Sequence, residues 1–228
     1  MYTWFQPIIA VLAQALSYLH TFTHDWGVSI ILLTLVVKMA LFRFNLTAAR
    51  QHIRTAAMGP HLKKLQQTHA ADPNRLMQES GKLYREHEVN PFAQMGGVLL
   101  QLPVLSAMYG LFLTHGSAMS SLLVPWVSHL ALADPLHVLP VLTGLMTFVV
   151  SLIPLTETAG PAPGSGKRAM LGVVLMLIPL LVTWRAPIAL GLYWMAGSAF
   201  GLLERLLYRT AFGKRLLRKG TPEPAQAS

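Results

Sequence analysis

The sequence predicts an all-α integral membrane protein with five transmembrane helices. Of its 228 residues, 53% are hydrophobic and only 12% are charged. Several apolar runs approach the length of about 20 residues that a helix needs to cross a bilayer. Lys and Arg outnumber Asp and Glu by 18 to 9 and gather between alternate apolar runs, as the positive-inside rule requires. These three observations favour a bundle of spanning helices over a soluble basic protein.

The apolar runs fix the expected order of elements. Residues 1–25 predict an interfacial amphipathic helix, because aromatic residues are spread through a run that is short for crossing; a further span is the alternative. Asp25 is expected to cap the first span. Spans are expected over residues 26–46, 95–114, 137–155, 169–184 and 187–206.

The segments between the spans differ sharply in charge. Residues 47–93 predict a basic helical hairpin on the cytoplasmic side, with amphipathic helices over about 51–70 and 75–88. With the loop 156–168 and the tail 207–228, this side carries seven, two and five basic residues, whereas the opposite side, including the outer loop 115–136, carries only Arg185. The N-terminus is therefore expected outside and the C-terminus inside.

Lys38 lies well inside the first predicted span. A lysine at the bilayer centre costs about 2.5–3.5 kcal/mol on insertion scales, so it is expected to face a polar cavity. Stepping 100° per residue places Thr34 and Asn45 on the face of Lys38. Arg43 lies nearer the cytoplasmic end, where a long side chain can reach the interface.

Further polar residues share helix faces in the second and third spans. Gln94 and Gln101 lie on one face at the start of the second span, and Thr143, Thr147 and Ser151 follow at four-residue spacing along the third. We expect these residues to line a groove with Lys38. Packing between helices is an equally good explanation of the hydroxyl residues, and close packing is the interpretation favoured for Gly197 and Gly201.

The sequence gives no sign of an enzyme. It contains no cysteine, which excludes disulfides, thiolate catalysis and cysteine-based metal sites. The nine histidines form no HExxH motif, and no G-x-S-x-G motif occurs. We therefore expect no catalytic residue, no cofactor and no metal.

Short motifs occur along nearly the whole chain: Asp-Trp-Gly at 25–27, Asn90-Pro91 followed by Gln101-x-Pro103, Asp134-Pro135 with Leu139-Pro140, and Pro187 with Leu190-x-Leu192-Tyr193. In order and spacing they resemble the YidC family of membrane protein insertases, in the form of a minimal five-span core without the large periplasmic domain. Two positions depart from the family pattern, since Lys38 stands where the family usually has Arg and Arg43 where it usually has Pro.

The resemblance implies a function in protein transport. The chain would act as an insertase and chaperone in the bacterial cytoplasmic (inner) membrane, receiving polar segments of nascent membrane proteins in a hydrophilic, positively charged groove. Gln101 matches a family glutamine, and the greasy path of substrate helices would be formed by Leu102, Pro103, Tyr193 and Trp194. Whether Lys38 or Arg43 carries the groove charge stays open.

Other functions and partners follow less directly. The basic tail could bind the ribosome or anionic lipid headgroups, and the oligomeric state is open, a monomer being compatible with the sequence. The alternative function is a small-molecule or ion carrier using Lys38 as its coupling site. That alternative requires an acidic partner within the spans, for which Glu204 is the candidate.

Overall fold

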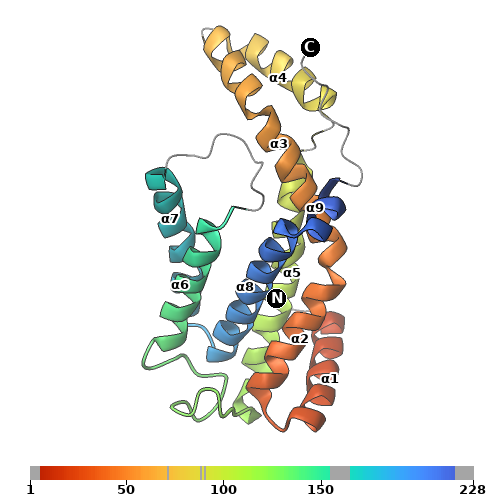
Figure 1. The fold of residues 1–228 in the computed structure, drawn as a ribbon. Coiled ribbons are helices and arrows are strands. Elements are labelled where there is room, and N and C mark those ends of the chain that lie inside the picture. Colours follow the sequence, from red (N-terminus) through yellow and green to blue (C-terminus); the bar gives the residue numbers. More distant parts are fainter. Residues whose placement is uncertain (1–5, 71, 88, 90, 155–164, 219–228) are drawn as a thin grey trace. The chain divides into compact units, whose positions relative to one another are not determined.

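The computed structural model describes residues 6–70, 72–87, 89, 91–154 and 165–218, with the backbone alone for 91–101, 165–168 and 218. All regular structure in these ranges is helical (Figure 1). The predicted all-α class is confirmed for this part of the chain.

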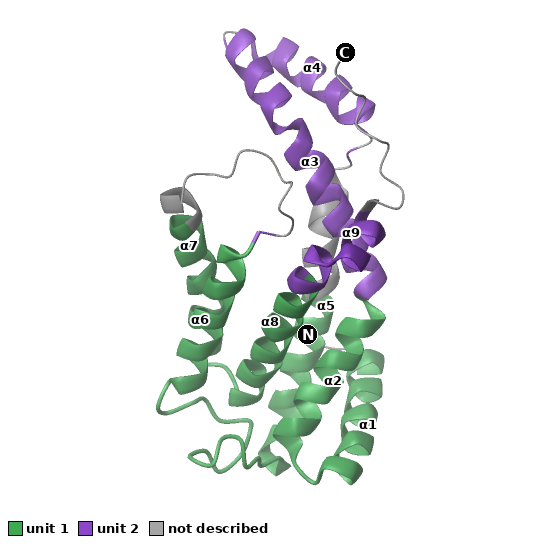
Figure 2. Cartoon of the chain, viewed as in Figure 1, with its two compact units in different colours: residues 1–41, 100–153, 163–204 green, residues 42–99, 154–162, 205–228 purple. Residues whose placement is uncertain are grey.

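The chain divides into two compact units (Figure 2). Unit 1 comprises residues 1–41, 100–153 and 163–204, and unit 2 comprises 42–99, 154–162 and 205–228.

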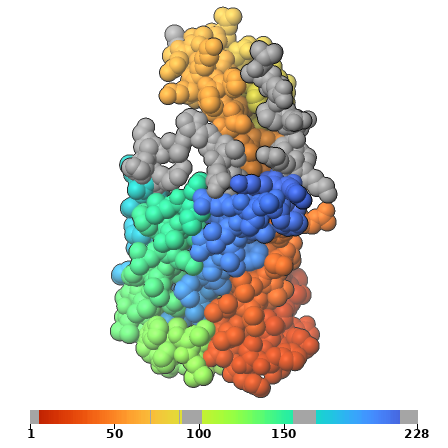
Figure 3. Space-filling view, in the orientation of Figure 1, coloured from red at the N-terminus to blue at the C-terminus, as the bar shows by residue number. Residues whose placement is uncertain are grey.

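Unit 1 contains most of the apolar helices. They are α1 (Gln6–Thr23), α2 (Trp26–Ala40), the later part of α5 (Pro91–His115), the short 3₁₀ helix η2 (Gly116–Ala118), α6 (Val138–Leu152), α7 (Ser165–Thr183) and most of α8 (Ile188–Arg209). α1 packs beside α2, and α6 packs beside α7 (Figure 1). In the space-filling view α1 and α2 form one continuous surface (Figure 3).

The core of unit 1 joins residues that are distant in sequence. Leu16 of α1, Ile30 of α2, Phe112 of α5, Leu130 of the loop and Leu190 of α8 are all buried in one apolar cluster. Removing such side chains from water stabilises a fold by about 1.5–3 kcal/mol each. The cluster therefore holds α1, α2, α5, α8 and the loop between η2 and α6 together.

The first predicted span is not one straight helix. α2 ends at Ala40 and α3 (Phe42–Thr68) begins two residues later, with a bend of 59° between them. The N–H of Leu41 still donates to the Val37 carbonyl at 3.0 Å, so the helical ladder fails only beyond this residue. Judged by length and composition, no single helix in the described residues could cross a membrane, but α2 and α3 taken together as a bent pair could.

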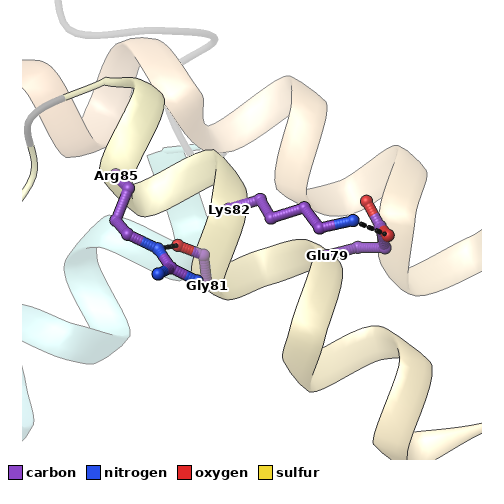
Figure 4. A network of polar contacts seen from close by, with 4 residues as sticks. All are labelled: Glu79, Gly81, Lys82 and Arg85. Carbon is purple, nitrogen blue, oxygen red and sulfur yellow. Dashed lines mark hydrogen bonds and ion pairs between the residues drawn. The ribbon is translucent and has the colours of Figure 1, made fainter.

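Unit 2 contains a polar helix pair. α3 lies beside α4 (Pro73–Glu86) (Figure 1). Asp72 caps α4 by accepting the Arg75 N–H at 3.0 Å, and Pro73 suits the first helical position because its missing N–H would have no partner there. On α4, Lys82 forms an ion pair with Glu79 at 2.8 Å, and Arg85 Nε donates to the Gly81 carbonyl at 3.2 Å (Figure 4).

The predicted basic tail begins as an ordered helix. α9 (Ala211–Arg218) packs on α3, and an apolar cluster formed by Leu46, Ala49, Tyr208 and Leu217 is buried between them and the end of α8. Arg50 Nη2 also donates to the Leu216 carbonyl at 2.8 Å. The rest of the predicted tail, 219–228, lies outside the described residues.

Candidate functional site

Lys38 is half-buried on the last turn of α2 and lies against α8. A Cβ atom built on Gly197 would lie 3.4 Å from Lys38 Cε and 3.9 Å from its Nζ. The lysine stem thus lies in van der Waals range of this position of α8, where a Cβ atom would fit but a long side chain would meet the lysine. Both residues belong to unit 1.

The helix face beside Lys38 also carries an acid. Gly197, Gly201 and Glu204 follow one another at helical spacing and therefore share one face of α8. Glu204 attracts Lys38 electrostatically. A Cβ atom built on Gly201 would have no described atom within 4 Å, whereas at Gly197 the nearest atoms belong to the lysine side chain. Close helix packing at these two glycines stays a prediction.

Thr34 lies one turn before Lys38 but is packed in the core. It is 1% exposed, and its hydroxyl donates to the Ile30 carbonyl of its own helix at 2.7 Å. A threonine whose hydroxyl donates a hydrogen bond to a carbonyl of its own helix can be buried among apolar side chains without an unpaired polar group. Its place in a groove stays a prediction.

Arg43 and Asn45 both lie beyond the bend, at the start of α3 in unit 2. The helical wheel that put Asn45 on the face of Lys38 required one straight helix, so that argument does not extend across the break. Arg43 is exposed and Asn45 is half-buried. Their parts in a groove stay predictions.

The predicted residues of the second and last spans are only partly described. Gln94 and Gln101 lie in α5, but their side chains fall outside the described residues. Leu102 is 51% exposed and Tyr193 is 3% exposed in the core of unit 1. Pro103 and Trp194 are half-buried.

The hydroxyls of α6 bond to their own helix. Thr143 is buried and donates to the Pro140 carbonyl at 2.8 Å. Thr147 and Ser151 donate in the same way to Thr143 and Phe148, at 2.8 and 2.6 Å. A Cβ atom on Gly172 of α7 would lie 2.6 Å from Ser151 Oγ, which favours the packing explanation for this serine.

Asp25 fastens the loop of residues 119–137 to the start of α2. Its carboxylate accepts the Val28 N–H at 2.9 Å, the Ser121 hydroxyl at 2.7 Å and the Leu122 N–H at 2.6 Å. Burial alone would raise the pKa of this carboxyl, but these hydrogen bonds, with one from the Gly27 N–H, together lower it. Gly27 is required beside it, because a Cβ there would collide with the Ser121 side chain.

A second buried carboxylate organises the other end of the loop. Asp134 is 2% exposed and accepts Trp126 Nε1–H at 3.0 Å, the Leu136 N–H at 3.0 Å and the Leu139 N–H at 2.8 Å. The loop is also bonded to the start of α8, where the Ile188 N–H donates to the Leu132 carbonyl at 2.7 Å.

Sequence reasoning placed Asp25 at a helix start but missed this network. The available signal was the occurrence of an acid in two motifs, Asp-Trp-Gly at 25–27 and Asp134-Pro135. Local sequence cannot reveal that Ser121 is the partner of Asp25, because the two residues meet only after α1, α2 and α5 have packed. The two motifs therefore have a structural explanation within unit 1.

Comparisons with known proteins agree with one another. The family model described as "60Kd inner membrane protein" matches residues 18–215. The "Membrane protein insertase YidC" of Legionella pneumophila (strain Corby) is 28% identical over 205 residues, covering 89% of this chain and 35% of the relative. The protein of the same name from Nitrosomonas europaea is 28% identical over 223 residues, covering 98% of this chain and 35% of the relative.

A solved structure shares the fold. "Active YidC insertase crystal structure with the first transmembrane domain resolved" aligns with a TM-score of 0.62 at 22% identity, covering 91% of this chain and 47% of that one. The alignment shows that the chain shares the fold of that protein, which is all-helical in the described residues, and the family model shows that the chain belongs to the 60Kd inner membrane protein family. This confirms the resemblance drawn from the motifs. The chain spans about a third of the length of the two curated relatives.

Proposed function

We propose that the chain is a membrane protein insertase. It receives polar segments of nascent membrane proteins in a hydrophilic, positively charged groove within the membrane and releases their apolar helices into lipid. No covalent bond is made or broken in this process, so the protein acts as a chaperone rather than an enzyme.

The placement of Lys38 is the observation that carries this proposal. The lysine lies on an apolar helix, half-buried against Gly197 of α8. A cation in such surroundings is costly unless it serves a polar pathway. Family membership supports the same conclusion, because the curated relatives are named insertases.

The chemistry required of the groove is electrostatic. A fixed ammonium in surroundings of low dielectric attracts an acidic or polar segment more strongly than it would in water. This attraction lowers the cost of carrying the segment partway across the bilayer. The apolar helix of the substrate then leaves along Leu102, Pro103 and Trp194 and partitions into lipid, driven by the hydrophobic effect. Tyr193, which is buried in the core of unit 1, would support this path from behind.

The proposed topology has five spans in the bacterial inner membrane, with the N-terminus outside and the C-terminus inside. The excess of basic residues in the hairpin and tail supports this orientation. α6 contains 15 residues, which corresponds to about 22 Å at 1.5 Å per residue. A span this short is accommodated by local thinning of the bilayer, and thinning would shorten the path of a polar segment.

Complementation tests the proposal directly. The host's own insertase is depleted, this chain is supplied, and insertion of a small single-span substrate with an acidic outer segment is scored by protease accessibility. We expect insertion to be restored by the chain and absent with an empty vector. Equal insertion with chain and vector would overturn the proposal.

The alternative function, a small-molecule or ion carrier coupled through Lys38, has one feature in its favour, since Glu204 interacts with the lysine. The presence of an acid on the helix face that Lys38 approaches also has an explanation within an insertase. Because the relatives are named insertases, the carrier is not favoured.

A further inference from the structure

Glu204 differs from the other described acidic residues of unit 1 because it lies within a helix. It is the only acidic residue within the described helices of unit 1. Asp25 and Asp134, the acids next to those helices, are committed to the 119–137 loop by several hydrogen bonds each. Glu204 therefore supplies the negative charge that α8 presents to Lys38.

The geometry of α8 brings this acid to the lysine. Gly197 admits the Lys38 stem, since a Cβ atom built on this glycine would lie 3.4 Å from Lys38 Cε. Glu204 lies seven residues later, two turns along the same helix face. Its electrostatic attraction to Lys38 agrees with this placement.

A pair of opposite charges at this position lowers the positive charge that is available to an incoming substrate segment. Burying a lone ammonium costs several kcal/mol, and a nearby carboxylate offsets part of that cost. The resting lysine is then already neutralised by its own protein. An acidic group on a substrate has to replace the internal carboxylate, rather than bind to a free cation.

We propose that Glu204 is a specificity-determining residue, the internal counter-ion that an acidic substrate segment must displace from Lys38. Weakly acidic or neutral segments gain little binding free energy at Lys38, because they do not displace Glu204 from it. This inference rests on the proposed insertase function.

Space for the displaced carboxylate lies beside Gly201. Gly201 lies one turn before Glu204 on the same face, and the described residues leave the space that a Cβ atom on Gly201 would face empty to 4 Å. In this proposal the displaced carboxylate of Glu204 moves toward this space, so that Gly197 accommodates the lysine and Gly201 accommodates the released acid.

Chemical cross-linking tests the pair in the unaltered chain. A hydrophobic carbodiimide activates carboxylates and joins them to a neighbouring amine as an amide, and mass spectrometry identifies the joined peptides. The Glu79–Lys82 pair, at 2.8 Å, is the internal positive control. We expect an amide between Lys38 and Glu204 in membranes. Its absence while Glu79 and Lys82 are joined would overturn the proposal.

A substrate pair tests the consequence. Two substrates differ only by Asp or Asn in the outer segment, and the ratio of their insertion is measured with the wild-type chain and with Glu204→Gln. Removing the competing charge is expected to raise the Asp-to-Asn ratio by at least about fivefold, the lower end of typical coupling between sites. Adding Lys38→Ala to Glu204→Gln is expected to bring the ratio close to one.

The outcomes separate the two proposals. If the wild-type chain inserts neither substrate, the insertase function itself fails. If it inserts both substrates and Glu204→Gln leaves the ratio unchanged or lowers it, the counter-ion role fails while the insertase function stands. Should Glu204→Gln not accumulate in membranes, the cross-link in the wild-type chain decides.

Discussion

The carboxylate of Asp25, at the start of α2, accepts the hydroxyl hydrogen bond of Ser121 at 2.7 Å across 96 residues of sequence. This bond ties the beginning of the helix that carries Lys38 to the loop of residues 119–137. The same loop is bonded to the start of α8, the helix that carries Gly197. One ordered loop thus fixes the ends of both helices that meet at the lysine.

Replacing Asp25 by Ala is expected to destabilise the fold markedly. The change removes a helix cap and leaves the N–H of Leu122 and the hydroxyl of Ser121 without their acceptor. Each hydrogen bond to a charged group contributes about 1.5–3 kcal/mol. Thermal unfolding followed by tryptophan fluorescence in detergent measures the effect. Asp72→Ala is the matched control, because Asp72 caps α4 in the same way but is exposed; an equal effect of both changes would contradict the account.

The same carboxylate predicts an acid dependence of stability. Hydrogen bonds lower the pKa of folded Asp25, whereas the unfolded chain has an ordinary value of about 3.9. A depressed folded pKa stabilises the fold above the unfolded value, and this contribution disappears as the pH falls through the folded one. The difference in unfolding midpoint between wild type and Asp25→Asn should therefore be full at pH 7 and shrink below about pH 4. A difference that is constant with pH would contradict this prediction.

Enlarging Gly197 is expected to displace Lys38. A Cβ atom fits, because its 3.4 Å distance to Lys38 Cε is an ordinary contact, but a leucine would occupy the space of the lysine stem. Gly197→Leu should therefore impair insertion of the acidic substrate about as much as Lys38→Ala, whereas Gly197→Ala should preserve it. Protein abundance in membranes is measured alongside. Normal insertion by an abundant Gly197→Leu variant would show that the lysine does not need this site.

The basic surface of α9 predicts a salt-sensitive interaction with ribosomes. Lys214 and Arg215 are exposed on this helix, and contacts with RNA phosphates weaken steeply as salt rises. Lys214→Glu with Arg215→Glu is a sharper test than truncation, because deleting α9 would uncover the apolar cluster around Tyr208. We expect cosedimentation with ribosomes at low salt to be lost. Unchanged cosedimentation would exclude this surface.

Much of the fold could be predicted because it depends on local pattern. Apolar runs and charge asymmetry indicated an all-helical chain, and Asp25 was expected to cap the first span, where it caps α2. The break at Leu41 could not be predicted, since Ala40-Leu41-Phe42 contains neither Gly nor Pro and reads as continuous helix. Likewise, α9 was expected as part of a tail because its packing on α3 depends on tertiary contacts.

The candidate site was only partly predictable for the same reason. A charge in an apolar run identified Lys38, because the cost of burying a charge is visible in sequence. The partners of that charge were not visible. Gly197 looked like a packing motif, and Glu204 was named as an acidic partner only for the alternative carrier function; the approach of α2 to α8 relates both residues to the lysine. Thr34 shows the reverse case, since a shared helix face did not keep its side chain out of the core.

The role of Lys38 as the groove charge is tested most directly by insertion of the acidic substrate in cells depleted of their own insertase. The wild-type chain is compared with Lys38→Ala, Lys38→Arg and Arg43→Ala at equal abundance. We predict that Lys38→Ala impairs insertion, that Lys38→Arg restores it because the positive charge is kept, and that Arg43→Ala has little effect because Arg43 is exposed. Normal insertion with Lys38→Ala together with failure of Arg43→Ala would contradict this account and assign the charge to Arg43.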